Sequence, residues 1–110
     1  MYILTVVAYP KPGKAADLRQ ACRDLTAASA DHEGLSSYQW TAADDSGALN
    51  LVEVHADERS IFNHIELADV EALGAASERY DDCHLYGPQP SQELTDLLSS
   101  VAPLTVHVTI

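Results

Sequence analysis

The pattern of apolar and polar positions begins with a segment, Tyr2–Tyr9, whose alternating faces are both apolar. Its β-branched and aromatic residues predict a strand, and a strand with two apolar faces needs cover on both sides. The segment 10–13, which contains Pro and Gly, ends it. From Lys14, apolar residues recur at the helical period, which predicts a helix that stops at a C-cap, Gly34.

Two further strands are predicted in the middle of the chain, at Leu35–Thr41 and Leu49–His55. The turn-forming segment Asp44–Gly47 lies between them, so the two strands should form a hairpin. Asp57 is a good N-cap and leads the second of these strands directly into a helix. This tight connection should bring the end of the strand close to the start of the helix.

Weaker patterns complete the core. Leu67–Arg79 carries apolar residues at helical spacing and is expected to be helical, although Gly74 is a poor helix former. Cys83–Tyr86 is expected to be a short fourth strand. The order strand, helix, strand, strand, helix, strand predicts an α+β protein with the ferredoxin-like fold, an antiparallel sheet with helices on one face. Because the first strand needs cover on both faces, the bare face of this sheet predicts a homodimer.

A C-terminal extension follows this core. Ser91 is a good N-cap for a helix with a leucine-rich face, and Pro103 ends that helix. Apolar and polar residues then alternate over Leu104–Ile110, which predicts a half-buried extra strand along a sheet edge. We expect this edge to belong to the partner subunit. All 110 residues are predicted to form one domain.

The charge of the chain limits its partners. Six basic residues stand against seventeen acidic ones, a formal net charge of -11. Such a field repels phosphate backbones and anionic headgroups, so neither nucleic acid nor a membrane surface is an expected partner. A strongly anionic ligand is disfavoured unless a local cluster reverses the field, and the basic residues form no run. We therefore expect a small neutral or aromatic ligand.

Cysteine usage and the N-terminus indicate the compartment. Cys22 and Cys83 lack the spacing of a metal or redox motif and the density of a disulfide scaffold, so we expect two buried thiols in a reducing environment. The apolar run at the N-terminus is too short, and lacks the basic flank, for a signal peptide or a membrane span. The chain is predicted to be cytoplasmic.

The side chains best suited to catalysis lie on either side of the strand-to-helix connection at Asp57. Glu53 and His55 are two apart on a strand and share a face, so Glu53 could orient His55 as a general base. Asn63 and His64 lie on the helix that follows. We predict Glu53, His55, Asn63 and His64 as the catalytic residues. The alternative is that the strand pair fixes the turn and that His64 bonds a backbone group.

A metal site is the other hypothesis for this cluster. Glu53, His55 and His64 make a set of two histidines and one carboxylate, which non-haem iron or another divalent cation accepts. Their spacing matches no dedicated metal motif, so no metal is predicted. The chain also lacks a phosphate-binding loop and a nucleophile elbow, and no cofactor is predicted.

Aromatic residues suggest where a ligand would bind. Tyr38 and Trp40 share one face of their strand, and Phe62 lies on the helix after Asp57. We predict that these three side chains line an aromatic-binding pocket. The alternative is that they fill the core or the dimer interface.

Three segments resemble a known family: KPGK at 11–14, HEGLSSYQW at 32–40 and LVEVHADERSIFNHI at 51–65. They are similar to antibiotic biosynthesis monooxygenase-like proteins of the dimeric α+β barrel superfamily. The resemblance covers about residues 2–86, and the extension at about 87–110 lies outside it. It implies a dimeric α+β barrel and a cofactor-independent monooxygenase acting on a small phenol- or quinol-like molecule. The alternative within the same fold is a non-catalytic module for small-molecule binding or assembly.

The match to the family pattern is incomplete on the third strand. That strand usually has an apolar residue, Glu and Trp at alternate positions, followed by a helix with a His. Glu53 and His64 fit this pattern, but His55 stands in place of Trp. In the most similar oxygenases an Asn precedes this Trp by four residues. Leu51 occupies that position here, and Asn50 is one place off and so on the other face.

Haem degradation, another activity in the family, is disfavoured by the sequence. Haem degraders resemble one another in an Asn on the first strand, a Trp on the third and a haem-ligating His after the second helix. This chain offers Val6 or Val7, His55, and no His between Ile65 and Cys83.

Overall fold

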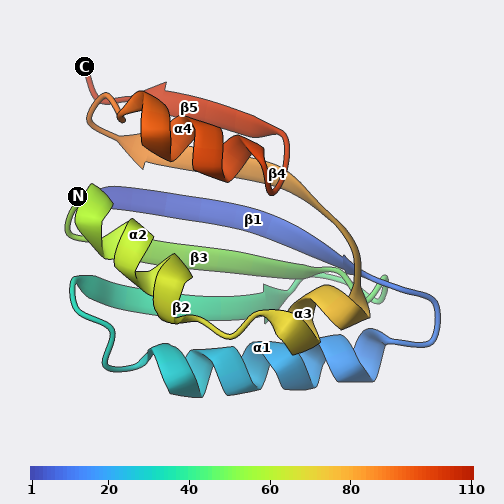
Figure 1. Ribbon diagram of the computed structural model, residues 1–110. Helices are drawn as coiled ribbons and strands as arrows, with labels where there is room; N and C mark the ends of the chain where they lie inside the picture. The colour runs from blue at the N-terminus through green and yellow to red at the C-terminus, as the bar shows by residue number, and fades with distance from the viewer.

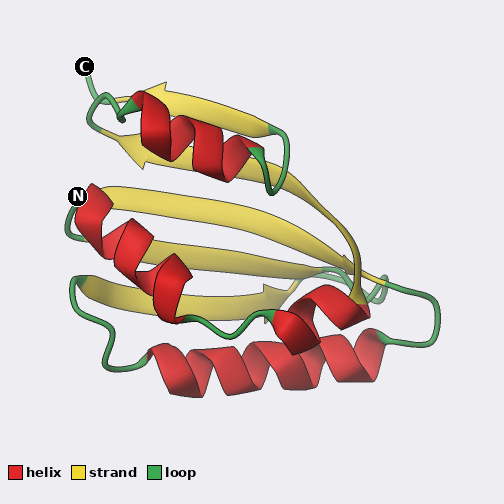
Figure 2. Ribbon diagram, viewed as in Figure 1, coloured by secondary structure: helices red, strands yellow, loops and turns green.

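The computed structural model describes residues 1–110, with all helices on one side of a single sheet (Figure 2). The five strands lie in the order β2-β3-β1-β4-β5. β1 is antiparallel to both β3 and β4, and β2 is antiparallel to β3, as in a ferredoxin-like fold. This confirms the predicted fold class. The strands are β1 (Tyr2–Pro10), β2 (Leu35–Ala42), β3 (Leu49–His55), β4 (Ser77–Gly87) and β5 (Leu104–Val108).

Four helices cover this sheet: α1 (Ala15–Ser29), α2 (Glu58–Leu67), α3 (Glu71–Ala76) and α4 (Gln92–Ser99). Figure 1 shows α1 running beside β2 at one edge and α4 lying over β4 and β5 at the other. Asp57 caps α2 and Ser91 caps α4, as the sequence predicted. None of the helices is long and apolar enough to cross a membrane.

The first helix is shorter than predicted. It ends at Ser29 instead of continuing to Gly34, and His32 N–H donates to the Ser29 carbonyl at 3.1 Å in the turn that follows. The only apolar side chain in the segment 30–34 is that of Ala30, which is exposed, so nothing there extends the buried face of the helix. Gly34 instead adopts a φ of +80° in the loop before β2.

The helix predicted over Leu67–Arg79 is wrong at its C-terminal end. α3 ends at Ala76, and the next residues begin β4, which is much longer than the predicted Cys83–Tyr86. The cause is pairing with β1: Tyr9 lies opposite Arg79, and Lys11 N–H donates to the Ala76 carbonyl at 2.9 Å. Backbone hydrogen bonds between this segment and β1 stabilise the strand more than the spacing of its apolar residues stabilises a helix.

The extra strand lies along a sheet edge, but the edge belongs to its own chain. β5 pairs in parallel with β4, and α4 connects the two. Leu94 and Leu98 of α4 are buried in the same core cluster as Leu4 and Leu85. Packing α4 on that core brings the following strand to the free edge of β4, so the expectation of an edge in the partner is wrong.

The sheet has one covered face and one bare face. Leu4 and Ala8 of β1 point to the helices and are buried, whereas Ile3 and Val7 point the other way and are half-buried. Val52 on β3, on the bare face, is 37% exposed. The two-faced pattern of β1 therefore has cover from its own chain on one side only. The thiols of Cys22 and Cys83 are buried and unpaired, as predicted.

Candidate active site

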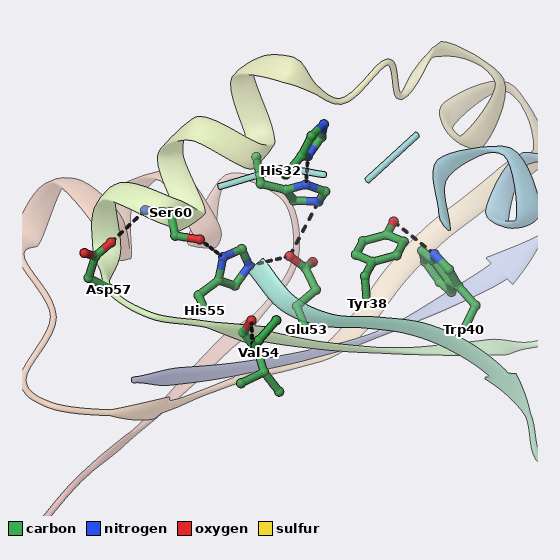
Figure 3. Close-up of polar contacts among 10 residues, drawn as sticks. His32, Tyr38, Trp40, Glu53, Val54, His55, Asp57 and Ser60 are labelled. Atoms are coloured by element: carbon green, nitrogen blue, oxygen red, sulfur yellow. Dashed lines mark hydrogen bonds and ion pairs between the residues drawn. The ribbon is translucent and has the colours of Figure 1, made fainter. Parts of the chain in front are cut away.

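A buried polar network lies where β3 enters α2 (Figure 3). Glu53 and His55 sit on the covered face of β3, and His55 is completely buried. His55 Nε2 is 2.7 Å from Glu53 Oε1, and His55 Nδ1 is 2.7 Å from Ser60 Oγ. Asp57 positions Ser60, because its carboxylate accepts the Ser60 backbone N–H at 2.9 Å. Both ring nitrogens of His55 are therefore used within the protein.

The loop before β2, residues 30–34, covers this network. Gly34 lies so close to α2 that a Cβ on it would sit 2.8 Å from Ser60 Oγ. The Gly34 carbonyl also accepts the Ala56 N–H at 2.8 Å, which fixes the loop beside the end of β3. The absence of a side chain at Gly34 thus permits the loop to seal the contact between His55 and Ser60 from solvent.

The same loop supplies a histidine that the sequence analysis left without a role. His32 Nδ1 is 2.8 Å from His64 Nδ1, and the other nitrogen of His64 is 3.5 Å from Glu53 Oε1. The Glu53 carboxylate therefore faces both His55 and His64. If His64 Nε2 carries a proton towards Glu53, its Nδ1 can accept the Nδ1–H of His32. Neutral rings satisfy every contact in this arrangement.

The environment of His64 favours its neutral form. Burial lowers the pKa of His64 below its ordinary value of 6.5. Glu53 opposes this shift, and the nearby rings of His32 and His55 add to it. Near neutral pH His64 is an uncharged imidazole that can accept a proton, with a carboxylate beside it to stabilise the cation that would form.

Tyr38 lies between this network and the aromatic end of β2 (Figure 3). It is opposite Glu53 in the pairing of β2 with β3, and its ring centroid is 5.2 Å from that of His64. Trp40 Nε1–H donates to the Tyr38 hydroxyl at 3.0 Å, with the rings edge to face. Burial raises the pKa of Tyr38 far above its ordinary value, so the hydroxyl stays protonated.

An open groove of about 560 Å³ runs between α1 and the C-terminal half of β2. Its volume is within the size range of small-molecule sites. Tyr38, Trp40 and Leu49 form part of its wall. Tyr38 therefore contacts His64 with its ring and also lines the groove. The full lining is Arg19, Cys22, Arg23, Thr26, Ala27, Tyr38, Gln39, Trp40, Thr41, Ala42 and Leu49.

The structure brings together some of the predicted site residues and separates others. Glu53, His55 and His64 meet in one network, as expected from the strand-to-helix connection. Asn63 takes part in none of its hydrogen bonds or ion pairs. Phe62 packs against the core cluster beneath α4 and does not line the groove with Tyr38 and Trp40.

His32 and Ser60 belong to the network but were not predicted. A signal for His32 existed in the hairpin: Leu35 lies opposite His55, so the residues just before β2 must pass the end of β3. Ser60 lies three residues after the N-cap, where a polar side chain on α2 can turn towards the strand. His32 lies in the segment 32–40 and Ser60 in the segment 51–65, both of which resemble the family, but the resemblance gave neither residue a role.

Glu53, His55 and His64 contact one another directly and do not surround a shared metal position. The carboxylate is in contact with His55 at 2.7 Å, and the second nitrogen of His55 is held by Ser60. No three carboxylate, imidazole or thiol groups are placed to share a metal ion. As arranged, these residues suit proton transfer better than metal ligation.

Fold and site together define a ferredoxin-like α+β protein with a ligand-sized groove beside a buried histidine–carboxylate network. Residues 1–76 match the family model for antibiotic biosynthesis monooxygenase, and the chain belongs to this family. The resemblance seen in the sequence is thereby confirmed. A search of curated proteins by sequence found no significant match.

Solved structures share the fold at low sequence identity. MupZ from Pseudomonas fluorescens is 13% identical with a TM-score of 0.75, over 99% of this chain and 89% of its own. An antibiotic biosynthesis monooxygenase-family protein from Nitrosomonas europaea is 22% identical with a TM-score of 0.70, over 82% and 100%. Rv0793 from Mycobacterium tuberculosis is 16% identical with a TM-score of 0.65, over 83% and 97%. At these identities the similarity establishes the fold alone.

Proposed function

We propose that this protein is a cofactor-independent monooxygenase that binds a small phenol- or quinol-like molecule in the groove between α1 and β2. Membership of the family and the size of the groove support this proposal. The observation that carries it is the position of Tyr38. This residue lines the groove and contacts His64, the neutral imidazole of the buried network.

His64 is the general base in this proposal. His64 Nδ1 takes the hydroxyl proton of the substrate once its 2.8 Å contact with His32 opens, and the imidazolium that forms is stabilised by Glu53, whose Oε1 is 3.5 Å from His64 Nε2. His55 is a positioning residue: held by Ser60, it fixes the carboxylate through the 2.7 Å contact. His32 continues the chain of contacts to a half-buried position, which gives the proton a route to solvent.

The oxidation then uses the electrons of the substrate itself. The phenolate is electron-rich and reduces O₂. One oxygen atom is inserted on the ring carbon, the other leaves as water, and a phenol becomes a quinone. Because His64 lies outside the groove lining, the ring of Tyr38 must turn aside during the reaction, which breaks its 3.0 Å hydrogen bond with Trp40.

A non-catalytic binding role is the second candidate. The observation that favours it is the burial of the histidines: His55 is completely buried, and His64 is only 4% exposed and lies outside the groove lining. In that case the network only braces the junction of β3 and α2, and the groove binds a small molecule without turning it over.

We also propose a homodimer in which the bare faces of two sheets pack together. Half-buried apolar side chains on β1 and β3, among them Ile3, Val7 and Val54, would be covered in this way. The proposal applies to the face opposite the helices, so the groove beside α1 would remain on the outside of the paired sheets.

Oxygen uptake distinguishes the two functional candidates. With 1-naphthol as the probe and no added cofactor, an electrode should record one O₂ consumed for each 1,4-naphthoquinone formed. His64→Gln should lower the rate at least about 100-fold, the usual contribution of a general base. Asn63→Ala, the neighbouring residue outside the network, should leave it unchanged. If the wild-type protein binds 1-naphthol but consumes no oxygen, the binding role stands and the monooxygenase is ruled out.

A further inference from the structure

The charges around the groove are the reverse of those of the whole chain. Of the six basic residues in the sequence, Arg19 and Arg23 line the groove, and none of the seventeen acidic residues does. The net charge of the chain disfavours anionic ligands unless a local cluster reverses the field. These two arginines form such a cluster, although it is invisible as a run in the sequence.

The two arginines are on one helix face and have no partners. They stand four residues apart on α1, so their side chains are neighbours, and both are exposed. Neither forms an ion pair, whereas Lys14 pairs with Asp17 at 3.4 Å. Arg79, which stacks at 4.0 Å over the ring of Tyr9, also has a partner.

The acidic residues of the same helix lie on a different side. Asp17 and Asp24 line a separate, smaller depression between α1 and α3, and Asp24 accepts a hydrogen bond from Gln20 at 2.9 Å. The helix thus separates its charges, with carboxylates towards α3 and guanidinium groups towards β2. The groove is the place where an incoming anion meets positive charge without competing carboxylates.

We infer that the ligand of the groove is an aromatic acid, with its carboxylate on Arg19 and Arg23 and its ring against Trp40 and Tyr38. This inference rests on the proposed binding of a small aromatic molecule there. A guanidinium group presents paired N–H donors that match a carboxylate, and an indole offers a face for a planar ring. Of the small neutral or aromatic ligand expected from the sequence, this assignment keeps the aromatic ring and adds a negative charge.

A matched pair of ligands tests the assignment. Calorimetric titration at low ionic strength would compare 1-hydroxy-2-naphthoate with its methyl ester, which has the same ring system and phenol but no charge. The acid should bind at least about tenfold more tightly. Trp40 is the sole tryptophan, so quenching of its emission by both compounds would place them in the groove.

Arginine variants locate the source of the preference. Arg19→Gln and Arg23→Gln should each weaken binding of the acid by about fivefold and leave binding of the ester unchanged. Arg59→Gln, an exposed arginine on α2 outside the groove, is the control and should change neither affinity. The preference for the acid should also shrink as salt is added, because exposed charges are screened.

The outcomes separate this inference from the proposed function. Equal affinities for acid and ester, or a preference for the acid that survives both groove variants, would overturn the aromatic acid while leaving an aromatic ligand in place. Failure of both compounds to bind would overturn the proposed aromatic site together with this inference.

Discussion

Glu53 is the residue that joins the two histidines of the buried network. Its carboxylate faces His55 at 2.7 Å and His64 at 3.5 Å, in a place with only 5% exposure. A buried charge needs such partners, because desolvation without them is costly. Glu53 and His32 act on His64 in opposite senses: the carboxylate raises the pKa of His64 and the second ring lowers it.

Two substitutions should therefore move the pKa of His64 in opposite directions. Glu53→Gln keeps the shape but removes the charge that favours the imidazolium, so the pKa of His64 should fall further. His32→Gln removes a neighbouring ring that disfavours the imidazolium, so the pKa should rise. NMR titration of the His64 ring protons would measure both shifts. Shifts of the same sign in the two variants would contradict this description of the network.

Stability should follow the titration of His64. Its pKa is lowered in the folded protein, so the unfolded chain binds a proton first as the pH falls. The contribution of His64 to the free energy of unfolding should be constant above about pH 6.5. It should decrease as the pH falls from there to the pKa of the folded state, by about 1.4 kcal/mol for each unit between the unfolded and folded pKa values. Urea unfolding of wild type and His64→Gln would show this, and the variant should lack that part of the decrease.

At the level of elements, the loop before β2 and the start of α2 form one unit. Gly34 has a positive φ of +80° and faces Ser60 at a distance that excludes a Cβ. Gly13 also has a positive φ, +76°, but has open space around it. Comparing substitutions at these two glycines therefore distinguishes the cost of backbone strain from the cost of a steric overlap.

Gly34→Ala should be much more destabilising than Gly13→Ala. Gly13→Ala should cost about 1 kcal/mol, from left-handed backbone strain alone. Gly34→Ala adds an overlap at 2.7 Å with Ser60 Cβ and should cost about 3 kcal/mol in total. Thermal and urea unfolding would measure both. Equal losses would show that the loop can move away from α2 without cost.

Most elements were predictable because local and tertiary preferences agree there. The hairpin, the cap at Asp57 and the helix after Ser91 follow from turn and capping residues. The segment Ser77–Arg79 was not predictable, since its strand conformation comes from pairing with β1. The edge that β5 occupies was not either, because it depends on where α4 packs.

The site was predictable only within one stretch of chain. Glu53 and His55 are two apart on a strand, and that spacing alone places them together. Asn63 and His64 are adjacent on a helix, so they point about 100° apart and only one can face the network. His32 reaches the network from the loop before β2, and only the register of the hairpin, in which Leu35 lies opposite His55, could have indicated this contact.

At the scale of the whole molecule, β1 is the central strand of the sheet, and the helices cover only one of its faces. Val6 packs against the core beneath α2 and α4, whereas Val7 lies on the bare face. The proposed dimer would bury the second of these. The two adjacent valines therefore report on the monomer core and on the dimer interface separately.

Val6→Asp and Val7→Asp should have different effects. Val6→Asp places a charge in the core and should lower the free energy of unfolding by about 3 kcal/mol or more. Val7→Asp should yield a folded monomer, because it puts two like charges into the dimer interface. Sedimentation velocity with circular dichroism would separate the two. A wild-type monomer, or a Val7→Asp dimer, would exclude the face-to-face arrangement.

The most direct test of the proposed chemistry is the pH dependence of oxygen uptake with 1-naphthol, for wild type and Glu53→Gln. If neutral His64 is the base, the wild-type rate should fall on acidification with a midpoint below 6.5, since burial lowers the pKa of His64. In Glu53→Gln the midpoint should move to lower pH, matching the NMR titration of His64. A rate that does not change between pH 5 and 8, or a midpoint that stays the same in the variant, would contradict His64 as the base.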